Sequence, residues 1–434
     1  MKRRQFTQLM ATSALWPVLP AKAADDKPHQ LSSVGCGRAT GYAEANKIIT
    51  IGNRTHVAWL DSPAEGFRVR VATLNRNSGK WSRTITVGNA HDNHGGPALT
   101  CDSEGYLHIV YYTHHHPFRY RRSKLPNDAS EWDDEQLIGE KLTYPTLVCG
   151  KDNSLYLTAR RSDKNPWWVE LWEKPPGKAW LKVGPIMVSR HKGYAHFQES
   201  LSWGPDHKTL HLCCRFHELS DKSSYGRLQT VAYMKSTDFG RTWQRSDDSL
   251  IKTPATVEKI EVIARGGEDF KQTLRAGCLA VSPKGIPHLL FSIKANNRNH
   301  TYLNVLDTNG KWQRTDLHDH LPKTWQDYNL TMAGGLAFDA KGILHGVAQL
   351  QTGQRGPKIW GDPTNEIVKF VQRGNRFEFR ALSEFDPKAS HWLPSIERPT
   401  GHNLVPTLPG VLFTGGPAGA GNKDLISNNV YWNR

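Results

Sequence analysis

The amino-acid sequence predicts an all-β fold, a β-propeller with seven blades. Three observations support this prediction. A turn followed by a short apolar strand recurs along the 434 residues, long stretches with helical periodicity are missing, and one segment carries a turn motif typical of propeller blades. A repeat of about 50 residues that contains several strands is the pattern expected of propeller blades.

Each copy of the repeat joins a turn rich in Asp, Asn, Pro and Gly to a strand of apolar or alternating residues, which is a hairpin signal. The six visible copies span residues 52–60, 102–111, 151–159, 205–214, 282–291 and 339–348. A seventh copy is expected at residues 406–415, where the pattern is weaker, and the C-terminal segment 430–433 is expected to close the ring. A β-sandwich with appended strands is the alternative fold.

A histidine occupies the same strand position in most copies of the repeat. A residue type that recurs in most blades serves the scaffold and not the chemistry of one site. We therefore assign structural roles to His56, His108, His211, His288 and His345.

Residues 236–243, STDFGRTW, fit the Asp-box pattern S-x-D-x-G-x-T-W of sialidase-like propellers. We expect the carboxylate of Asp238 to cap a tight turn and the indole of Trp243 to pack beneath it. The motif marks the fold and predicts no catalytic role.

The first 23 residues differ from the rest of the chain. A basic segment, a short apolar segment and an AKA sequence follow one another, which is the pattern of an export signal. Arg3 and Arg4 resemble the twin-arginine type. We therefore expect a periplasmic or secreted protein in which residues 24–434 form a single catalytic propeller domain.

The net charge favours an acidic partner. The formal charge is +15, and the leader carries four basic residues and no acid, so the remaining chain keeps +11. A positive field concentrates anions at a surface, and outside the cytoplasm an acidic polysaccharide is a better candidate than nucleic acid. No apolar run reaches the roughly 18 residues of a transmembrane helix. A basic surface without a specific partner is the alternative, and we expect a monomer.

Histidines lie at both ends of residues 91–116, HDNHGGPALTCDSEGYLHIVYYTHHH. Cross-strand partners in a hairpin have residue numbers with a constant sum, and the turn at 102–105 places His94 opposite Thr113. Opposed Cβ atoms lie about 5 Å apart. His94 and the histidines at 114–116 are therefore predicted to meet at the end of the hairpin away from the turn.

The same rule places polar residues at the equivalent ends of three later hairpins. The predicted pairs are Tyr144 with Arg161, which is next to Arg160, Gln198 with Arg215, and Arg275 with Ser292. Equivalent hairpin ends share one face of a propeller, so these side chains are predicted to surround the axis. Polar strand ends with purely structural roles are the alternative.

Imidazole, phenol and guanidinium groups together suit β-elimination on a uronic acid. Arginine binds the carboxylate and stabilises the enolate-like charge, a base removes the C5 proton, and an acid protonates the leaving O4. A neighbouring cation favours the phenolate form of tyrosine.

Residues 93–123, NHGGPALTCDSEGYLHIVYYTHHHPFRYRRS, resemble the signature region of BNR-repeat polysaccharide lyases, the seven-bladed ulvan lyases and their relatives. The resemblance is strongest from about Asp92 to Arg161. It implies a lyase that cuts rhamnose–uronate linkages. The catalytic residues that it implies are His94, either His114 or His115, Tyr144 and Arg160. The residues that it suggests for substrate binding are Arg215, Arg275, Tyr194, His116 and Arg119.

Relatives of this kind can hold a structural zinc, for which Cys214, Cys278 and His196 are the candidate ligands. Buried apolar cysteines are the alternative, and no cofactor is expected to be required for catalysis. The alternative functions are a sialidase-like hydrolase, a non-catalytic glycan-binding propeller, and a lyase for rhamnose–glucuronate caps of plant gums.

Overall fold

The computed structural model describes residues 27–220, 223–266, 274–295, 298–352, 361–384, 386, 388–418 and 427–434. Across these residues the regular structure is almost entirely β, with two short 3-10 helices, η1 (Leu317–His320) and η2 (Lys323–Trp325). The all-β prediction is therefore confirmed. The predicted export signal lies outside the described residues, and no described helix is long and apolar enough to cross a membrane.

The largest sheet combines both ends of the described chain. Its path runs through β29 (Ala389–Ile396), β30 (Val411–Pro417), β31 (Asn428–Asn433), β1 (His29–Gly35), β3 (Arg54–Asp61), β4 (Arg68–Asn75) and β5 (Lys80–Trp81), with β2 (Ile48–Ile51) beside β3 and β6 (Ile85–Asn89) beside β4. The C-terminal strand β31 pairs antiparallel with β1, and Trp432 lies opposite His29. The predicted closure of the ring by the C-terminal segment is thus observed.

Four further sheets follow in chain order. The second sheet contains β7 (Ala98–Cys101), β8 (Leu107–Tyr111), β9 (His114–Arg122), β10 (Gln136–Cys149), β11 (Leu155–Arg161), β12 (Trp168–Lys174) and β13 (Leu181–Val188). The third contains β14 (Ala195–Trp203), β15 (Leu210–Ser220), β16 (Ser223–Ser236), β17 (Trp243–Gln244), β18 (Leu250–Ile251) and β19 (Glu261–Arg265). The fourth contains β20 (Leu274–Ala276), β21 (Ala280–Val281), β22 (Pro287–Ala295), β23 (Arg298–Leu306) and β24 (Trp312–Asp316). The fifth contains β25 (Tyr328–Phe338), β26 (Leu344–Thr352), β27 (Glu366–Arg373) and β28 (Arg376–Ala381).

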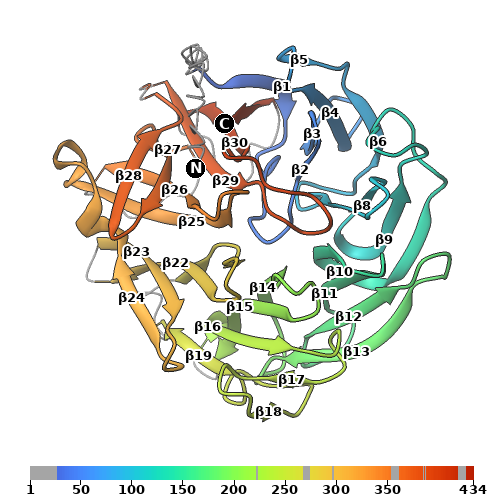
Figure 1. Cartoon of the computed structure of the whole chain (residues 1–434), viewed down its shortest axis with the longest axis vertical. Coiled ribbons are helices and arrows are strands. Elements are labelled where there is room, and N and C mark those ends of the chain that lie inside the picture. The colour runs from blue at the N-terminus through green and yellow to red at the C-terminus, as the bar shows by residue number, and fades with distance from the viewer. Residues whose placement is uncertain are drawn as a thin grey trace, which may run out of the picture.

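The sheets stand around a central axis in the ring arrangement typical of a β-propeller (Figure 1). Apolar side chains of neighbouring sheets pack between them, and Phe291 of β22 joins Val231 and Tyr233 of β16 in one such cluster. All six predicted repeat strands are present, as β3, β8, β11, β15, β22 and β26. The alternation of turn residues and apolar residues therefore identifies the strands that build each sheet.

The recurrent histidines are buried, as a scaffold role requires. His56 illustrates their environment: its two ring nitrogens lie 2.8 Å from the Thr73 hydroxyl and 2.9 Å from the side-chain oxygen of Asn127. His345 likewise pairs with Asp339 at 3.0 Å. These contacts tie the imidazoles to neighbouring turns and strands of the scaffold.

The Asp box has the predicted structure. The Asp238 carboxylate accepts hydrogen bonds from the Thr242 backbone amide and from its hydroxyl, at 2.8 and 2.6 Å. The Trp243 side chain is fully buried.

All six cysteines are buried and free. Cys213 and Cys214 belong to different hydrophobic clusters. This agrees with the expectation that neighbours on a strand face opposite ways.

Candidate active site

Two of the four predicted pairings are observed as the sequence predicts them. Gln198 in β14 lies opposite Arg215 in β15, and Arg275 in β20 lies opposite Ser292 in β22. The β14–β15 hairpin has no register shift, so counting from its turn gives the correct partner. The Nε atom of Arg215 donates a hydrogen bond of 2.6 Å to the side-chain oxygen of Gln198.

His94 reaches its predicted neighbour from a turn and not from a strand. Strand β7 begins only at Ala98, which pairs with Val110, so the observed register differs by one residue from the predicted one. The Thr113 hydroxyl nevertheless donates a hydrogen bond of 3.3 Å to the carbonyl of His94. Polar contacts of the loop therefore place His94 beside Thr113, where the sequence predicted it.

The predicted pairing of Tyr144 with Arg161 is wrong. In the structure Leu142 lies opposite Arg161 and Thr143 opposite Arg160, and the register shifts before Thr146. Tyr144 sits in this irregular stretch with φ of 60°, in the left-handed region that tyrosine rarely adopts. The irregularity turns the phenol ring toward Arg160, whose guanidinium carbon lies 4.8 Å from the ring centroid.

Asp92 joins two of the site's histidines. Its carboxylate oxygens lie 2.5 Å from Nδ1 of His114 and 3.5 Å from Nδ1 of His94. The His94 and His114 rings stack with centroids 4.1 Å apart. Burial acts to raise the pKa of Asp92, but hydrogen bonding to His114 and His94 outweighs it and holds the pKa below its usual range. Burial lowers the pKa of His94, so its imidazole is neutral near pH 7.

His115 faces different partners from its neighbour His114. Its Nδ1 lies 2.7 Å from the Ser162 hydroxyl, and its Nε2 lies 3.3 Å from a guanidinium nitrogen of Arg160. Burial and then the charge of Arg160 lower the pKa of His115 to about 4. Both histidines therefore border the site, with His114 in the Asp92 pair and His115 bonded to Arg160.

Tyr144 is almost completely buried, with 5% of its surface exposed. Burial raises the pKa of Tyr144 to about 12, although the charge of Arg160 and a hydrogen bond from Tyr42 act in the opposite direction. The charge of Arg160 favours the phenolate form, as expected of a nearby cation, but desolvation outweighs this attraction and keeps the phenol neutral.

Arg160 is held rigidly at the centre of the group. One guanidinium nitrogen donates a hydrogen bond of 3.1 Å to the carbonyl of Ala195, while the guanidinium faces the rings of Trp167 and Tyr194 at 4.8 and 5.9 Å. Its Nε is buried and has no hydrogen-bond partner within the described part of the chain. A carboxylate would satisfy this unpaired donor well.

Arg215 and Arg275 add positive charge near His196, which contacts Tyr144. The pKa of Arg215 falls to about 10, because of burial first and then the charge of Arg275. The His196 ring lies 4.5 Å from Tyr144, and burial together with Arg215 lowers the pKa of His196 far below its usual value. The site thus combines neutral imidazoles, a neutral phenol and arginines.

The remaining two predicted contact residues lie apart from Arg160. The His116 ring stands 4.3 Å from His91, and the Arg119 guanidinium lies 4.1 Å from the Tyr112 ring and 3.0 Å from Glu135. Neither of these contacts involves Arg160 or Tyr144.

The predicted zinc ligands do not come together. The thiol of Cys278 donates a hydrogen bond to the carbonyl of Leu336, and His196 takes part in the site around Tyr144. Among the described residues, the one group of three or more possible ligands is Asp92, His94 and His114. Because the expected set of Cys214, Cys278 and His196 is not assembled, the geometry gives no support to a zinc site there.

Several residues of the site were not anticipated from the sequence. Tyr42 contacts Tyr144 edge to face at 4.9 Å, and Arg38 acts on the pKa values of both Tyr144 and His94. Both precede the first repeat strand, where no hairpin arithmetic applies. Asp92, by contrast, lies within the histidine-rich stretch, and its position two residues before His94 was a usable signal.

Comparison with known proteins places this geometry in context. The sequence profile of the BNR repeat-containing family matches residues 54–320. The chain is 28% identical to the Ulvan Lyase-PL25 of Pseudoalteromonas sp. (strain PLSV) over 158 residues, which are 31% of this chain and 32% of that protein. It is 26% identical to an ulvan lyase of Nonlabens ulvanivorans over 293 residues, 59% of this chain and 61% of the relative. The matched segments thus span between about a third and three fifths of these curated relatives.

Solved structures share the fold at low identity. A polysaccharide lyase PL25 ulvan lyase bound to -[GlcA(1-4)Rha3S]- superposes with a TM-score of 0.69 at 16% identity, covering 93% of this chain and 95% of that chain. The polysaccharide lyase Uly1 superposes with a TM-score of 0.56 at 13% identity, covering 91% and 92%. These likenesses agree with the resemblance inferred from residues 93–123.

Proposed function

The chain belongs to the BNR repeat-containing family, and from this premise we propose that it is a polysaccharide lyase that cleaves a uronate-containing polymer by β-elimination. The observation that carries the proposal is the convergence of three groups. A stacked histidine pair on Asp92, the neutral phenol of Tyr144 and the rigid guanidinium of Arg160 surround one position.

Arg160 would bind the carboxylate of the uronate. Its buried, unpaired Nε and its fixed orientation suit a charge-assisted hydrogen bond to that group. Negative charge moves onto the carboxylate when the C5 proton leaves. A guanidinium fixed beforehand stabilises this charge more in the transition state than in the ground state.

His94 would act as the base, since its lowered pKa leaves the imidazole neutral. The C5–H bond breaks as the imidazole takes the proton, and the electron pair moves toward the carboxylate as an enolate-like charge. When this charge returns, the C4–C5 double bond forms as the C4–O4 bond breaks, and the Tyr144 hydroxyl gives its proton to O4. The stacked His114 ring would hold His94 in place, and Asp92 would stabilise the positive charge of His94.

We propose a rhamnose–uronate linkage, as in ulvan, for the substrate. The ligand of the PL25 ulvan lyase structure, -[GlcA(1-4)Rha3S]-, has this chemistry, and the net charge of +15 suits an acidic polymer. Rhamnose–glucuronate caps of plant gums contain the same uronate and remain the second candidate substrate.

The number of blades is also part of this proposal. The nine-stranded and seven-stranded sheets would each divide into two blades, and with the three smaller sheets this gives seven.

We also propose that residues 1–23 direct export, that residues 24–434 form one catalytic domain, and that the protein acts outside the cytoplasm as a monomer.

The decisive experiment is optical. Purified protein is incubated with ulvan, gum arabic, heparinoids and pectin while ultraviolet absorbance is followed. A lyase creates an unsaturated uronate that absorbs, whereas a hydrolase or a glycan-binding protein does not. Reducing ends that accumulate without new absorbance would replace the lyase proposal by a hydrolase.

A further inference from the structure

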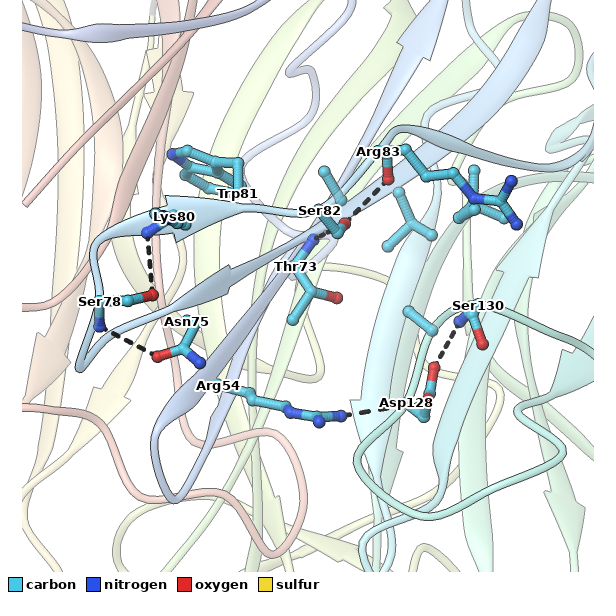
Figure 2. A pocket seen from close by; sticks show the side chains of 14 residues that line it. Arg54, Thr73, Asn75, Ser78, Lys80, Trp81, Ser82, Arg83, Asp128 and Ser130 are labelled. Atoms are coloured by element: carbon cyan, nitrogen blue, oxygen red, sulfur yellow. Dashed lines mark hydrogen bonds and ion pairs between the residues drawn. The ribbon is translucent and has the colours of Figure 1, made fainter.

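A cavity lies at the edge of the largest sheet, outside the candidate active site. It has a volume of about 470 Å³, which is within the range of small-ligand sites. Strand β4 and the segment from Ser78 to Ile85 form its floor and one wall, and the loop at residues 128–130 forms the other (Figure 2).

The walls of this cavity carry an excess of positive charge. Arg54, Lys80 and Arg83 line it, and Asp128 is the one acidic residue among the lining side chains. Arg54 lies 4.0 Å from Asp128 and also donates a hydrogen bond to the carbonyl of Asn127. Within the described part of the chain the amino group of Lys80 and the guanidinium of Arg83 have no ion-pair partner. Two cations are thus available to an anion.

An indole and hydroxyl groups complete a lining suited to a sugar. Trp81 is fixed by a parallel stack on His29 at 5.2 Å and by an edge contact with Trp432 at 5.4 Å. In Figure 2 its ring stands beside Lys80 at one end of the cavity. The exposed side chains of Ser78 and Ser130 add hydroxyl groups. A rigid aromatic group with hydroxyl groups and cations can bind both the faces and the charged groups of an acidic sugar.

The cavity adjoins the strand ends opposite those that lead to the candidate active site. Arg54 pairs with Asn75 at one end of β3 and β4, next to the cavity. At the other end Arg68 pairs with Asn89, and the loop that carries Asp92 and His94 follows directly. Eight residues of β3 at about 3.3 Å each separate the two ends by roughly 25 Å. One long polymer could therefore contact both places, whereas a short oligosaccharide could not.

We propose that this cavity is a secondary binding site for a carboxylated or sulfated segment of the polysaccharide. The inference rests on the proposed function for the identity of the polymer. By holding a distant part of the chain, the site raises the effective concentration of polymer at the active site.

The test uses the full-length protein and ulvan of defined lengths. The double variant Lys80→Ala/Arg83→Ala should raise KM for long ulvan by about fivefold more than KM for a tetrasaccharide, because only the long chain loses its second contact. The matched control Lys284→Ala/Lys341→Ala removes the same charge from exposed turns elsewhere and should leave both KM values unchanged. Asp128→Asn removes the one lining acid and should tighten the binding of long ulvan.

Binding is measured separately by calorimetry in a Tyr144→Phe background, so that turnover does not interfere. Weaker binding of long ulvan in the Lys80→Ala/Arg83→Ala variant, with an unchanged melting temperature, supports the site. Equal weakening in the control pair, or none in either, overturns it and leaves non-specific charge attraction. If the wild-type protein binds ulvan without forming unsaturated product, the proposed function fails, and the calorimetry still decides on the secondary site.

Discussion

The Nδ1 atom of His114 lies 2.5 Å from a carboxylate oxygen of Asp92. This contact fixes the orientation of the His114 ring, and His94 stacks directly on it. An aspartate that orients an imidazole sets which nitrogen is free to exchange a proton. The contact between Asp92 and His114 therefore predicts that Asp92 positions the imidazoles. A pH–rate profile can distinguish this role from a purely structural one.

Replacing His94 by alanine should lower kcat on the order of a hundredfold or more, since it removes the proposed base. Asp92→Asn should lower kcat less, roughly tenfold, and should also move the acidic limb of the pH–rate profile to lower pH. The reason is that Asp92 raises the pKa of His94. Steady-state kinetics from pH 4 to 8 measure both effects. An Asp92→Asn profile with reduced kcat but an unmoved limb would indicate a structural role only.

Tyr144→Phe should reduce turnover by about a hundredfold or more, because the phenyl ring packs as the phenol does but donates no proton. In the wild-type protein kcat/KM should rise with pH through the lowered pKa of His94. It should then stay level until the phenol of Tyr144 ionises near its pKa of about 12. An alkaline limb close to neutral pH would contradict Tyr144 as the acid.

Arg160→Gln should lower kcat/KM by at least about thirtyfold, since loss of one partner of a buried charged pair costs about 2–5 kcal/mol. Its neighbour Arg161 offers a matched control, because Arg161 is bound to Asp163 at 2.7 Å. Arg161→Gln should change kcat/KM by no more than about twofold. Circular dichroism and melting temperature establish that both variants fold, and equal activity of the two would remove Arg160 from the mechanism.

His56→Gln should act on stability and leave turnover unchanged. Burial lowers the pKa of His56 to about 4, so between about pH 4 and the unfolded value near 6.5 the unfolded chain binds more protons. The free energy of unfolding should therefore fall as pH falls through this window, by up to about 1.4 kcal/mol per pH unit from this residue. Urea unfolding at pH 7 and pH 5 should show a shallower pH dependence for His56→Gln than for the wild-type protein. The exposed His91→Gln should retain the wild-type dependence, and an identical slope in all three proteins would contradict this account.

Much of the fold could be predicted from short sequence patterns. The turn at residues 102–105 precedes β8, and the carboxylate of Asp102 accepts hydrogen bonds from the amides of Glu104 and Tyr106. Such contacts involve residues only two to four positions apart, so they are visible in the sequence. The apolar strands between the turns have only one way to bury their side chains, against the neighbouring sheets.

The candidate site was predicted in part, and the wrong pairing of Tyr144 has a structural cause. Counting from a turn gave the partner of Arg215, where the hairpin has no register shift. It failed for Tyr144, where an irregular stretch with positive φ shifts the register. A bulge redirects a side chain without changing the pattern of apolar residues, so the periodicity of the sequence does not reveal the bulge.

The sequence by itself determined the all-β class, the six repeat strands and the closing strand at the C-terminus. It also indicated that His, Tyr and Arg side chains gather at the hairpin ends away from the turns. Only the tertiary structure decided that Asp92 pairs with His114, that Tyr144 stays a buried phenol and that Arg160 faces it. The physical reason is one of range. Strands and turns follow from contacts within a few residues, whereas desolvation and side-chain direction depend on loops and strands that meet only when the ring closes.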